Sequence, residues 1–441
     1  MSDGTHVVTA FLRNEGTVLL LRRSDAVGTY TGQWGGVSGF AEGDPDEQVL
    51  VEITEETGLD ESAVDLVRSG TPVRFTDADL DRDWVVHPYL FDCDTQEVAL
   101  SEEHDAYEWV SPTEIPRRDA VPELWTAYDR VAPTVRSITA DDEHGAAYLS
   151  LRALEVLRDR AGLLVQEDAA DEDAWDELAD LGKRLLRARP SMAVLRNRVN
   201  RVLASADRAA ASVEQYAIDG IHRAVTADTD AAVRAGALVG DRTVLTLSRS
   251  GTVLRALQEG DPTEVFVAES RPGNEGVDVA ETLLSAYPVT LVTDAGVAHT
   301  MATEDVDAVV VGADTVLPDG TVVNKTGTRA AALAAAHEEI PLYVVCSTDK
   351  VSIEATVNLE TGRRSAVYDG DAPLSVSNPL FDETPPHLVD SIVTERGDLD
   401  AREVTEVAEE LRSLASWGDR EVPDETAEEE EDTRSPAGRE S

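Results

Sequence analysis

Lysine is almost absent from this chain of 441 residues. Only Lys183, Lys325 and Lys350 occur, so arginine supplies nearly all of the 38 basic residues that face 87 acidic ones. The formal net charge of -49 argues against non-specific binding to nucleic acid or to an anionic membrane, because both carry negative charge themselves. At molar salt the Debye length is ~3 Å and crowded carboxylates repel each other little. The composition therefore predicts a protein of a high-salt cytoplasm.

Cysteine and long apolar runs are scarce as well. Cys93 and Cys346 fall in different predicted domains, so we expect no disulfide framework and a reducing compartment. The chain opens on a polar segment that lacks the basic region of a signal peptide, and no apolar run approaches the ~20 residues needed to span a bilayer. These absences predict a cytoplasmic protein without a membrane partner.

The chain contains enough hydrophobic residues to form several cores. Its hydrophobic fraction is 42%, and its length exceeds that of one ordinary domain. Strand-rich, helical and alternating strand–helix patterns follow one another, and the chain ends on an acidic run without apolar periodicity. The predicted domains are residues 1–132, 140–232 and 235–415, followed by a disordered acidic tail over residues 416–441.

Short strands dominate the first part. The runs His6–Leu12 and Thr17–Leu21 predict a hairpin, and a helix is expected around Glu123–Arg130. A later strand, Trp84–Phe91, contains Pro88. Because proline cannot donate to a ladder of hydrogen bonds, this strand is expected at an edge or beside a bulge.

The second and third parts predict a helical bundle and a Rossmann-like parallel α/β sheet. Ala147, Leu151, Leu154 and Leu157 recur at three- and four-residue spacing, which makes one apolar helical stripe. Continuous apolar runs then alternate with helical segments, as in a parallel sheet covered on both faces. The expected strands are Thr243–Leu247, Glu264–Ala268, Val289–Thr293, Ala308–Val311, Leu342–Cys346 and Val389–Val393.

Polar residues follow most of these strands, at the edge where α/β sheets bind ligands. Gly251 and Gly327 each open a helix, whose free N–H groups and dipole favour a phosphate. The alternative is that polar residues follow strands simply because loops are polar and because serine or aspartate caps helices. As a set, the residues favour a ligand site, and its candidates are Ser248, Arg249, Ser250, Gly251, Glu269, Arg271, Asp314, Lys325 and Gly327.

The order of motifs in this half resembles the translation initiation factor 2B α/β/δ-subunit family. That family shares its fold with isomerases that act on methylthioribose 1-phosphate and ribose 1,5-bisphosphate. The matching motifs are Val244–Leu257, Val267–Pro272, Val311–Asp314, Asn324–Thr328, Asn378–Pro386 and Thr394–Gly397, of which the last two resemble the archaeal ribose-bisphosphate branch. The resemblance adds Asn324 and Arg189, from an Arg-Pro-Ser motif, to the ligand residues and implies a homo-oligomer assembled through this half.

The isomerases of this family use a cysteine and an aspartate to move a proton between neighbouring sugar carbons. Asp314 matches the aspartate, whereas Ser248 stands at the position of the cysteine. His144 stands near the position where the isomerases hold substrate with an Arg-Gly pair. Because an unassisted serine hydroxyl is a poor base, these departures favour binding of a phosphorylated ligand over turnover, as in the non-catalytic initiation-factor subunits.

Three glutamates in the first part form a second candidate site. Glu52, Glu55 and Glu56 stand at i, i+3 and i+4 and therefore share one helical face. Three like charges repel unless a cation compensates them, and Mg²⁺ prefers such oxygen ligands. The alternative is a solvated acidic face in a very acidic protein.

With Trp34, Gly39 and Gly58, these glutamates resemble the Nudix box. The Nudix family hydrolyses nucleoside diphosphates linked to another moiety. The resemblance implies an α/β/α sandwich, Mg²⁺ held by Glu52, Glu55 and Glu56, and a catalytic role for Glu52. Val51 replaces the family's arginine, and the loop before the helix is about two residues shorter than usual. We therefore expect the Nudix fold more firmly than Nudix hydrolysis.

Three functions remain open. The first is a regulatory, initiation-factor-like protein that binds a phosphorylated sugar or nucleotide, with the translation machinery as a candidate partner. The second is an aldose–ketose isomerase that uses Asp314. The third is a Mg²⁺-dependent Nudix hydrolase whose C-terminal half only provides assembly. We favour the first.

Overall fold

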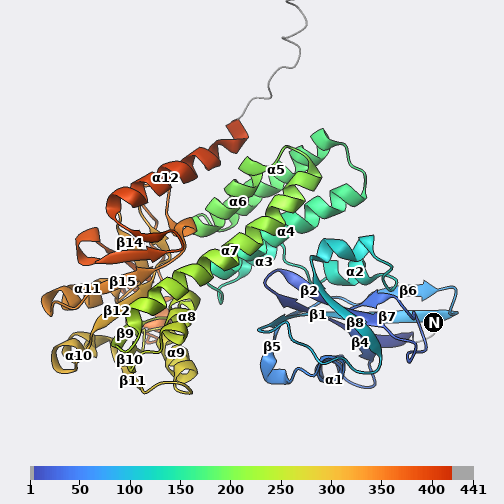
Figure 1. The fold of residues 1–441 in the computed structure, drawn as a ribbon, viewed down its shortest axis with the longest axis horizontal. Helices are drawn as coiled ribbons and strands as arrows, with labels where there is room; N and C mark the ends of the chain where they lie inside the picture. The colour runs from blue at the N-terminus through green and yellow to red at the C-terminus, as the bar shows by residue number, and fades with distance from the viewer. Residues whose placement is uncertain (1–3, 420–441) are drawn as a thin grey trace, which may run out of the picture.

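The computed structural model describes residues 4–419. The N-terminal sheet lies at one end of the molecule, a parallel sheet lies at the other, and long helices run between them (Figure 1). Residues 420–441, which hold most of the predicted acidic tail, lie outside the described part. No helix within residues 4–419 is long and apolar enough to cross a membrane.

The N-terminal domain is a mixed sheet with helices on both faces. Its strand order is β3-β2-β1-β7-β5, and β4, β6 and β8 pair with β1, β7 and β2. Side chains alternate along β1, so Val8 and Ala10 pack on the side of α1 while Phe11 packs on the side of α2. The elements are β1 (Thr5–Asn14), β2 (Thr17–Arg23), β3 (Trp34–Gly35), β4 (Val37–Phe40), α1 (Pro45–Thr57), η1 (Glu61–Ala63), β5 (Val64–Ser69), β6 (Val73–Asp77), β7 (Arg82–Cys93), β8 (His104–Val110), η2 (Pro112–Arg117) and α2 (Leu124–Asp129).

Of the two expectations for the strand with Pro88, the edge position is wrong, whereas an irregularity lies close by, because the register of β5 against β7 shifts between Leu66 and Arg68, opposite Phe91 and Leu90. β7 lies inside the sheet, paired with β1 on one side and with β5 and β6 on the other. Pro88 falls where the partner changes, because β6 pairs as far as Val86 and β5 begins at Tyr89. No ladder hydrogen bond from β7 is needed at that point, so an interior strand tolerates the proline.

Helices make up the middle of the chain. α3 (Val135–Ala140), α4 (Ala146–Gln166), α5 (Asp171–Ala188), α6 (Ala193–Ser205) and α7 (Ala210–Val239) pack around the apolar stripe expected on α4, of which Leu154, Leu157 and Ala161 are fully buried. α7 continues to Val239, so the limit predicted at residue 232 lies inside this helix. Trp417, 6% exposed, packs into the same core, and the fold therefore continues past residue 415.

The C-terminal domain is built on a sheet of the order β11-β10-β9-β12-β15-β17-β18, which is parallel except for the pair β17–β18. Two buried apolar clusters cover its two faces, as the continuous apolar runs predicted. Its strands and helices are β9 (Thr243–Leu247), α8 (Gly251–Gly260), β10 (Glu264–Ala268), α9 (Glu275–Leu283), β11 (Val289–Val292), η3 (Asp294–Gly296), α10 (Val297–Thr303), β12 (Ala308–Gly312), α11 (Thr328–His337), β15 (Leu342–Val345), η4 (Thr348–Lys350), η5 (Arg364–Ala366), η6 (Pro386–Leu388), β17 (Ser391–Thr394), β18 (Gly397–Leu399), α12 (Ala401–Ala415) and η7 (Ser416–Asp419).

A small antiparallel sheet stands at the carboxyl edge of the parallel one. It has the order β13 (Thr315–Val316), β14 (Val322–Lys325) and β16 (Phe381–Thr384). The hairpin β13–β14 follows Asp314 directly, and its far strand ends at Lys325. It thereby brings Lys325 back toward Asp314 at the end of the parallel strands.

Candidate functional site

Neighbouring strands bring Ser248 and Asp314 to the same edge of the C-terminal sheet. β9 and β12 are parallel neighbours in which Leu245 pairs with Val309, so the ends of both strands lie side by side. The loop after β9 approaches β12 closely, because a Cβ atom added to Gly312 would lie 2.7 Å from the Ser250 Oγ atom. Glycine at position 312 is therefore what lets this loop reach the site.

Asp314 is an acid in a cationic surrounding. The Lys350 ammonium, on a side chain only 8% exposed, donates a hydrogen bond to the Ala313 carbonyl next to it. Burial raises the pKa of the Asp314 carboxyl above its ordinary value, whereas the charges of Lys350 and Lys325 lower it. The net direction is upward, so Asp314 keeps its proton to a higher pH than a free aspartate does.

Ser248 is held by its backbone and not by its side chain. Its φ of +61° is a left-handed conformation that is uncommon outside glycine. The Ser248 N–H donates to the Ser270 Oγ atom at 2.7 Å, and the Ser270 N–H donates to Asp294 Oδ1 at 2.8 Å. Within residues 4–419 no side chain forms a hydrogen bond with the Ser248 hydroxyl. The serine is therefore fixed in place without a base to activate it.

The N-terminus of α8 is open to an anion. Ser250 caps the helix through the Val253 N–H, and Gly251 is exposed with no atom within 4 Å of where its Cβ would lie. Arg249 beside it is exposed and donates to the Glu143 carbonyl, at 3.3 Å. A phosphate at this helix end would meet free N–H groups and a guanidinium.

The second predicted phosphate site, at Gly327, is filled by the chain itself. The Gly327 N–H donates to Asp382 Oδ2 at 2.8 Å, and the Arg329 N–H donates to Asp382 Oδ1 at 3.1 Å. This carboxylate takes the N–H groups that were expected to be free, so a phosphate there would have to displace it. The local sequence around Gly327 does not reveal this partner, because Asp382 is 55 residues away along the chain.

Three further candidates are engaged in internal contacts. The Lys325 ammonium pairs with Glu275, and the buried Asn324 donates from Nδ2 to the Thr328 Oγ1 atom at 2.9 Å. Arg189 donates from Nε to the Ile138 carbonyl at 2.9 Å. Each of these side chains is thus held by a contact within the protein.

Glu269 and Arg271 complete the expected edge after β10. Glu269 is half-buried, and its N–H donates to the Val292 carbonyl at 2.8 Å. Arg271 is exposed and donates to Asn274 Oδ1 at 3.1 Å, while its backbone N–H donates to Asp294 Oδ2 at 2.6 Å. The Arg271 guanidinium therefore stands on the surface of the same edge as Arg249.

The three glutamates of the N-terminal domain do not behave alike. Glu52 accepts a hydrogen bond from Gln48 at 2.8 Å and packs against Gly39, where an added Cβ atom would lie 2.0 Å from its carboxyl carbon. Glu55 is exposed. Glu56 is 3% exposed and accepts from the Ser38 N–H at 3.1 Å. Within residues 4–419 no three acidic, histidine or cysteine side chains are gathered closely enough to hold a metal ion.

The chemistry of this acidic cluster nevertheless suits a cation. Burial, together with the charges of Glu52 and Glu103, raises the pKa of Glu56 to about 8 against the opposing Ser38 N–H. The Glu56 Oε1 atom is buried without a hydrogen-bond partner, which is the state of a carboxylate that awaits a proton or a cation. Glu52 and Glu56 are the side chains that would hold Mg²⁺, and a bound cation would lower the repulsion between these carboxylates. Glu103 is a further candidate ligand.

A cavity of about 460 Å³ opens beside this acidic cluster. Its wall includes Gly39 and Glu103 and four aromatic side chains, of which Phe40 and Trp84 lie nearly parallel with ring centroids 6.4 Å apart. The remaining aromatic side chains are Tyr30 and Phe75, and the cationic ones are Arg23 and Arg82. Aromatic faces and guanidinium groups suit a flat, anionic ligand.

Several residues of both sites were missed from the sequence. Lys350 could have been found, because it is one of only three lysines and follows a strand of the same sheet. Glu103 precedes β8 with no motif to mark it, and Glu275 and Asp382 are distant in sequence from the residues that they bind. Only the fold brings these side chains to the sites.

The fold and these two sites define a protein that joins an α/β/α sandwich to a Rossmann-like parallel α/β domain. Residues 142–401 match the Initiation factor 2 subunit family, and residues 5–131 match the NUDIX domain. The chain belongs to the Initiation factor 2 subunit family and carries an N-terminal NUDIX domain. Both resemblances drawn from the motifs, and the predicted fold class, are confirmed.

Relatives of the C-terminal part include isomerases. The chain is 34% identical over 310 residues to a ribose 1,5-bisphosphate isomerase of Haloferax volcanii, which covers 64% of this chain and 94% of the relative. It is 30% identical over 264 residues to a methylthioribose-1-phosphate isomerase of Exiguobacterium sibiricum, which covers 53% of this chain and 76% of the relative.

Solved structures show the same fold. The Pyrococcus horikoshii OT3 translation initiation factor eIF-2B matches with a TM-score of 0.52 and 27% identity, over 60% of this chain and 94% of that one. The 5-methylthioribose 1-phosphate isomerase from the same organism has a TM-score of 0.50 and 19% identity, over 71% of this chain and 90% of that one, which shows the fold alone.

Proposed function

We propose that the C-terminal half binds a phosphorylated sugar and acts as a regulatory member of its family, not as an isomerase with a cysteine-based mechanism. The observation that carries this proposal is Ser248. By resemblance it occupies the position of the catalytic cysteine, and no side chain among residues 4–419 assists its hydroxyl. A ligand could bind beside it without losing a proton to it.

The ligand contacts follow from the geometry of the edge. A phosphate binds at the N-terminus of α8, where Gly251 offers its N–H and Arg249 its guanidinium. The sugar hydroxyls then reach Asp314 and the lysines that flank it. A homo-oligomer through the C-terminal half, a cytoplasmic location and a role with the translation machinery belong to the same proposal.

The second candidate is an aldose–ketose isomerase. It is favoured by the raised pKa of Asp314, which suits proton transfer, and by relatives named as ribose 1,5-bisphosphate and methylthioribose-1-phosphate isomerases. An isomerase would need a base other than Ser248 to remove the proton from the sugar carbon.

Binding and turnover of ribose 1,5-bisphosphate by the full chain separate the two candidates. We expect calorimetric binding without ketose product, and about tenfold weaker binding in Arg249→Met, because a charge-assisted hydrogen bond contributes roughly 1.5–3 kcal/mol. Arg255→Met is the matched control, since Arg255 lies on the same helix and donates to Thr229. If the wild type forms a ketose and Asp314→Asn does not, the proposed regulatory function is wrong. Isomerase activity that appears only in Ser248→Cys would support it.

For the N-terminal domain we propose binding of a nucleoside diphosphate derivative in the 460 Å³ cavity, with its phosphates toward Glu52, Glu56 and bound Mg²⁺. Hydrolysis of that ligand is the alternative. Mg²⁺-dependent release of a nucleoside monophosphate from ADP-ribose, lost in Glu52→Gln, would establish hydrolysis. Binding of ADP-ribose without release of product would establish the binding function. If neither binding nor product release is observed, the proposal is wrong.

A further inference from the structure

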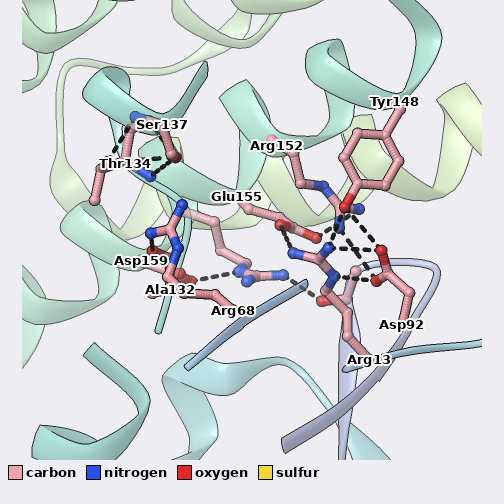
Figure 2. A network of polar contacts seen from close by, with 12 residues as sticks. Arg13, Arg68, Asp92, Ala132, Thr134, Ser137, Tyr148, Arg152, Glu155 and Asp159 are labelled. Carbon is pink, nitrogen blue, oxygen red and sulfur yellow. Dashed lines mark hydrogen bonds and ion pairs between the residues drawn. The ribbon is translucent and has the colours of Figure 1, made fainter. Parts of the chain in front are cut away.

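A buried ionic network joins the N-terminal sheet to helix α4 (Figure 2). Arg13 on β1 is 2% exposed and forms a bidentate pair with Asp92 on β7, with Nε–Oδ1 and Nη2–Oδ2 distances of 2.7 and 3.0 Å. Its Nη1 atom donates to Glu155 on α4 at 3.2 Å. Breaking one partner of such a pair leaves a buried charge uncompensated, so the network fixes α4 on the sheet.

Tyr148, in the first turn of α4, is the outermost member of this network. Its hydroxyl accepts a hydrogen bond from Arg13 Nη2 at 2.8 Å and donates one to Asp92 Oδ2 at 2.8 Å. The Arg152 guanidinium lies over its ring, 4.6 Å from the ring centroid. The phenol is therefore held at its hydroxyl by the N-terminal domain and on its ring by α4.

The Tyr148 ring also packs against the segment that precedes α4. The rings of Tyr148 and His144 stack with centroids 4.2 Å apart and an interplanar angle of 14°. His144 and Glu143 both donate backbone N–H groups to Asp141, at 2.8 and 3.1 Å, which closes a tight turn over residues 141–144. A cavity of about 270 Å³, lined by Arg13, His144 and Tyr148 among others, adjoins this turn. His144 therefore links the turn to the Tyr148 ring, in addition to its own Nδ1 contact with Asp141 Oδ2 at 2.8 Å.

The turn over residues 141–144 also contacts the candidate ligand site of the C-terminal domain. The Glu143 carbonyl accepts the hydrogen bond from Arg249, next to Ser248 and the open end of α8. The Ile138 carbonyl, on the helix just before the turn, accepts that of Arg189. Both arginines chosen as ligand contacts are therefore anchored on main-chain oxygens of residues 138–143, and this segment is anchored on the N-terminal domain through Tyr148.

From this series of contacts we propose that Tyr148 is a positioning residue for the C-terminal site, and that the N-terminal domain supports that site through Arg13 and Asp92. The role of Arg249 in ligand binding rests on the proposed function, whereas the positioning of the turn and of the α8 loop does not. Tyr148 is not among the proposed ligand contacts, and the contacts that link it to them run through His144, Glu143 and Arg249.

The test uses the full chain and two readouts. Affinity for ribose 1,5-bisphosphate is measured by calorimetry, and hydrogen–deuterium exchange is followed in residues 141–148 and 248–255 without ligand. Tyr148→Ala is expected to weaken binding about tenfold and to raise exchange in both segments. Tyr148→Phe keeps the ring stack but loses the link to Arg13 and Asp92, so a smaller change of the same sign is expected.

Glu214→Gln is the matched control. Glu214 accepts from Arg117 Nη2 at 2.6 Å, which is another contact between the N-terminal domain and the helices, away from the turn. This variant should change neither readout. The proposal is overturned if Tyr148→Ala leaves exchange in residues 248–255 unchanged, or if Glu214→Gln alters both readouts as much. If the wild type binds no ribose 1,5-bisphosphate, the proposed function fails while the exchange result still decides the positioning role.

Discussion

Two of the chain's three lysines lie beside the same carboxyl group. Lys325 and Lys350 both lower the pKa of Asp314 against the effect of burial, while Lys183 is exposed on α5 and pairs with Asp180. Lysine carries a compact charge on a flexible stem, whereas the planar guanidinium of arginine needs more room. In a chain that uses arginine almost everywhere else, two of the three lysines thus supply the compact charges that act on Asp314.

Glu56 gives the N-terminal domain a stability that depends on pH. Its carboxyl has a pKa of about 8 in the folded chain, raised by burial, against an ordinary value of 4.5. Between these values the folded state keeps a proton that the unfolded state has lost, so stability falls as pH rises through this window. Glu56→Gln removes that dependence and should raise the melting temperature relative to wild type near pH 9 more than near pH 5, by the equivalent of roughly 1–4 kcal/mol.

Thermal unfolding of both proteins at constant salt checks this prediction. Burial lowers the pKa of His104, 4.0 Å from Glu56, to about 4. Between about pH 4 and pH 6.5 this histidine therefore makes stability rise with pH, which is opposite to the effect of Glu56. For that reason the quantity to compare is the difference between variant and wild type at each pH. Glu55→Gln, on the exposed face of the same helix, is the control. A difference that stays constant from pH 5 to pH 9 would contradict the role given to Glu56.

At the scale of elements, α11 depends on a partner that local sequence does not reveal. Gly327 opens the helix with a φ of +114°, and Asp382 on β16 accepts from the first-turn N–H groups in the way that an N-cap side chain would. Asp382→Ala should lower the free energy of unfolding by ~0.5–2 kcal/mol, since the N–H groups lose their acceptor. Chemical denaturation measures the loss.

Glu383→Ala is the comparison for this helix. The Glu383 side chain is exposed on the same strand, so its removal should change the unfolding free energy by less than about 0.5 kcal/mol. Equal losses in the two variants would mean that the carboxylate of Asp382 does not cap α11.

The elements themselves were largely predictable, because their signals are local. Apolar runs placed β9 and β10 correctly to the residue, and Gly251 and Gly327 marked the starts of α8 and α11. Predictions failed where a distant segment decides the outcome. Pro88 sits inside a sheet because two other strands share its far side, and the helix end at Gly327 is closed by Asp382. Spacing along the chain carries no information about such partners.

At the scale of the molecule, charges on the surface and charges in the interior differ in how strongly salt screens them. The formal charge of -49 is a surface property, screened at high salt. The buried arginines Arg13, Arg158 and Arg198 are each paired with carboxylates within the protein. Arg13 pairs across the boundary with Glu155 on α4, and Arg158 on α4 donates to the Gly16 carbonyl, so buried charges that salt screens little connect the two halves.

Arg158 offers the most direct test of that union. It is 1% exposed on α4, donates to the Gly16 carbonyl in the turn between β1 and β2, and pairs with Asp159 at 2.8 Å. Arg158→Met leaves Asp159 buried without its cation, which costs roughly 3–5 kcal/mol. Because the lost contact lies between the domains, calorimetry should show an N-terminal transition that separates and moves to lower temperature.

The matched variant is Arg160→Met, two residues further along the same helix. Arg160 pairs with Glu177 on the outer side, where both side chains are partly exposed, and such pairs contribute about 0–1 kcal/mol. Its unfolding should stay close to that of the wild type. If both variants shift the calorimetric profile equally, the effect comes from α4 itself, and the N-terminal domain is held by its apolar contacts and not by the buried pair. If only Arg158→Met separates the transitions, the Arg158 side chain, through its hydrogen bond to the Gly16 carbonyl in the β1–β2 turn, is what makes the two halves unfold together.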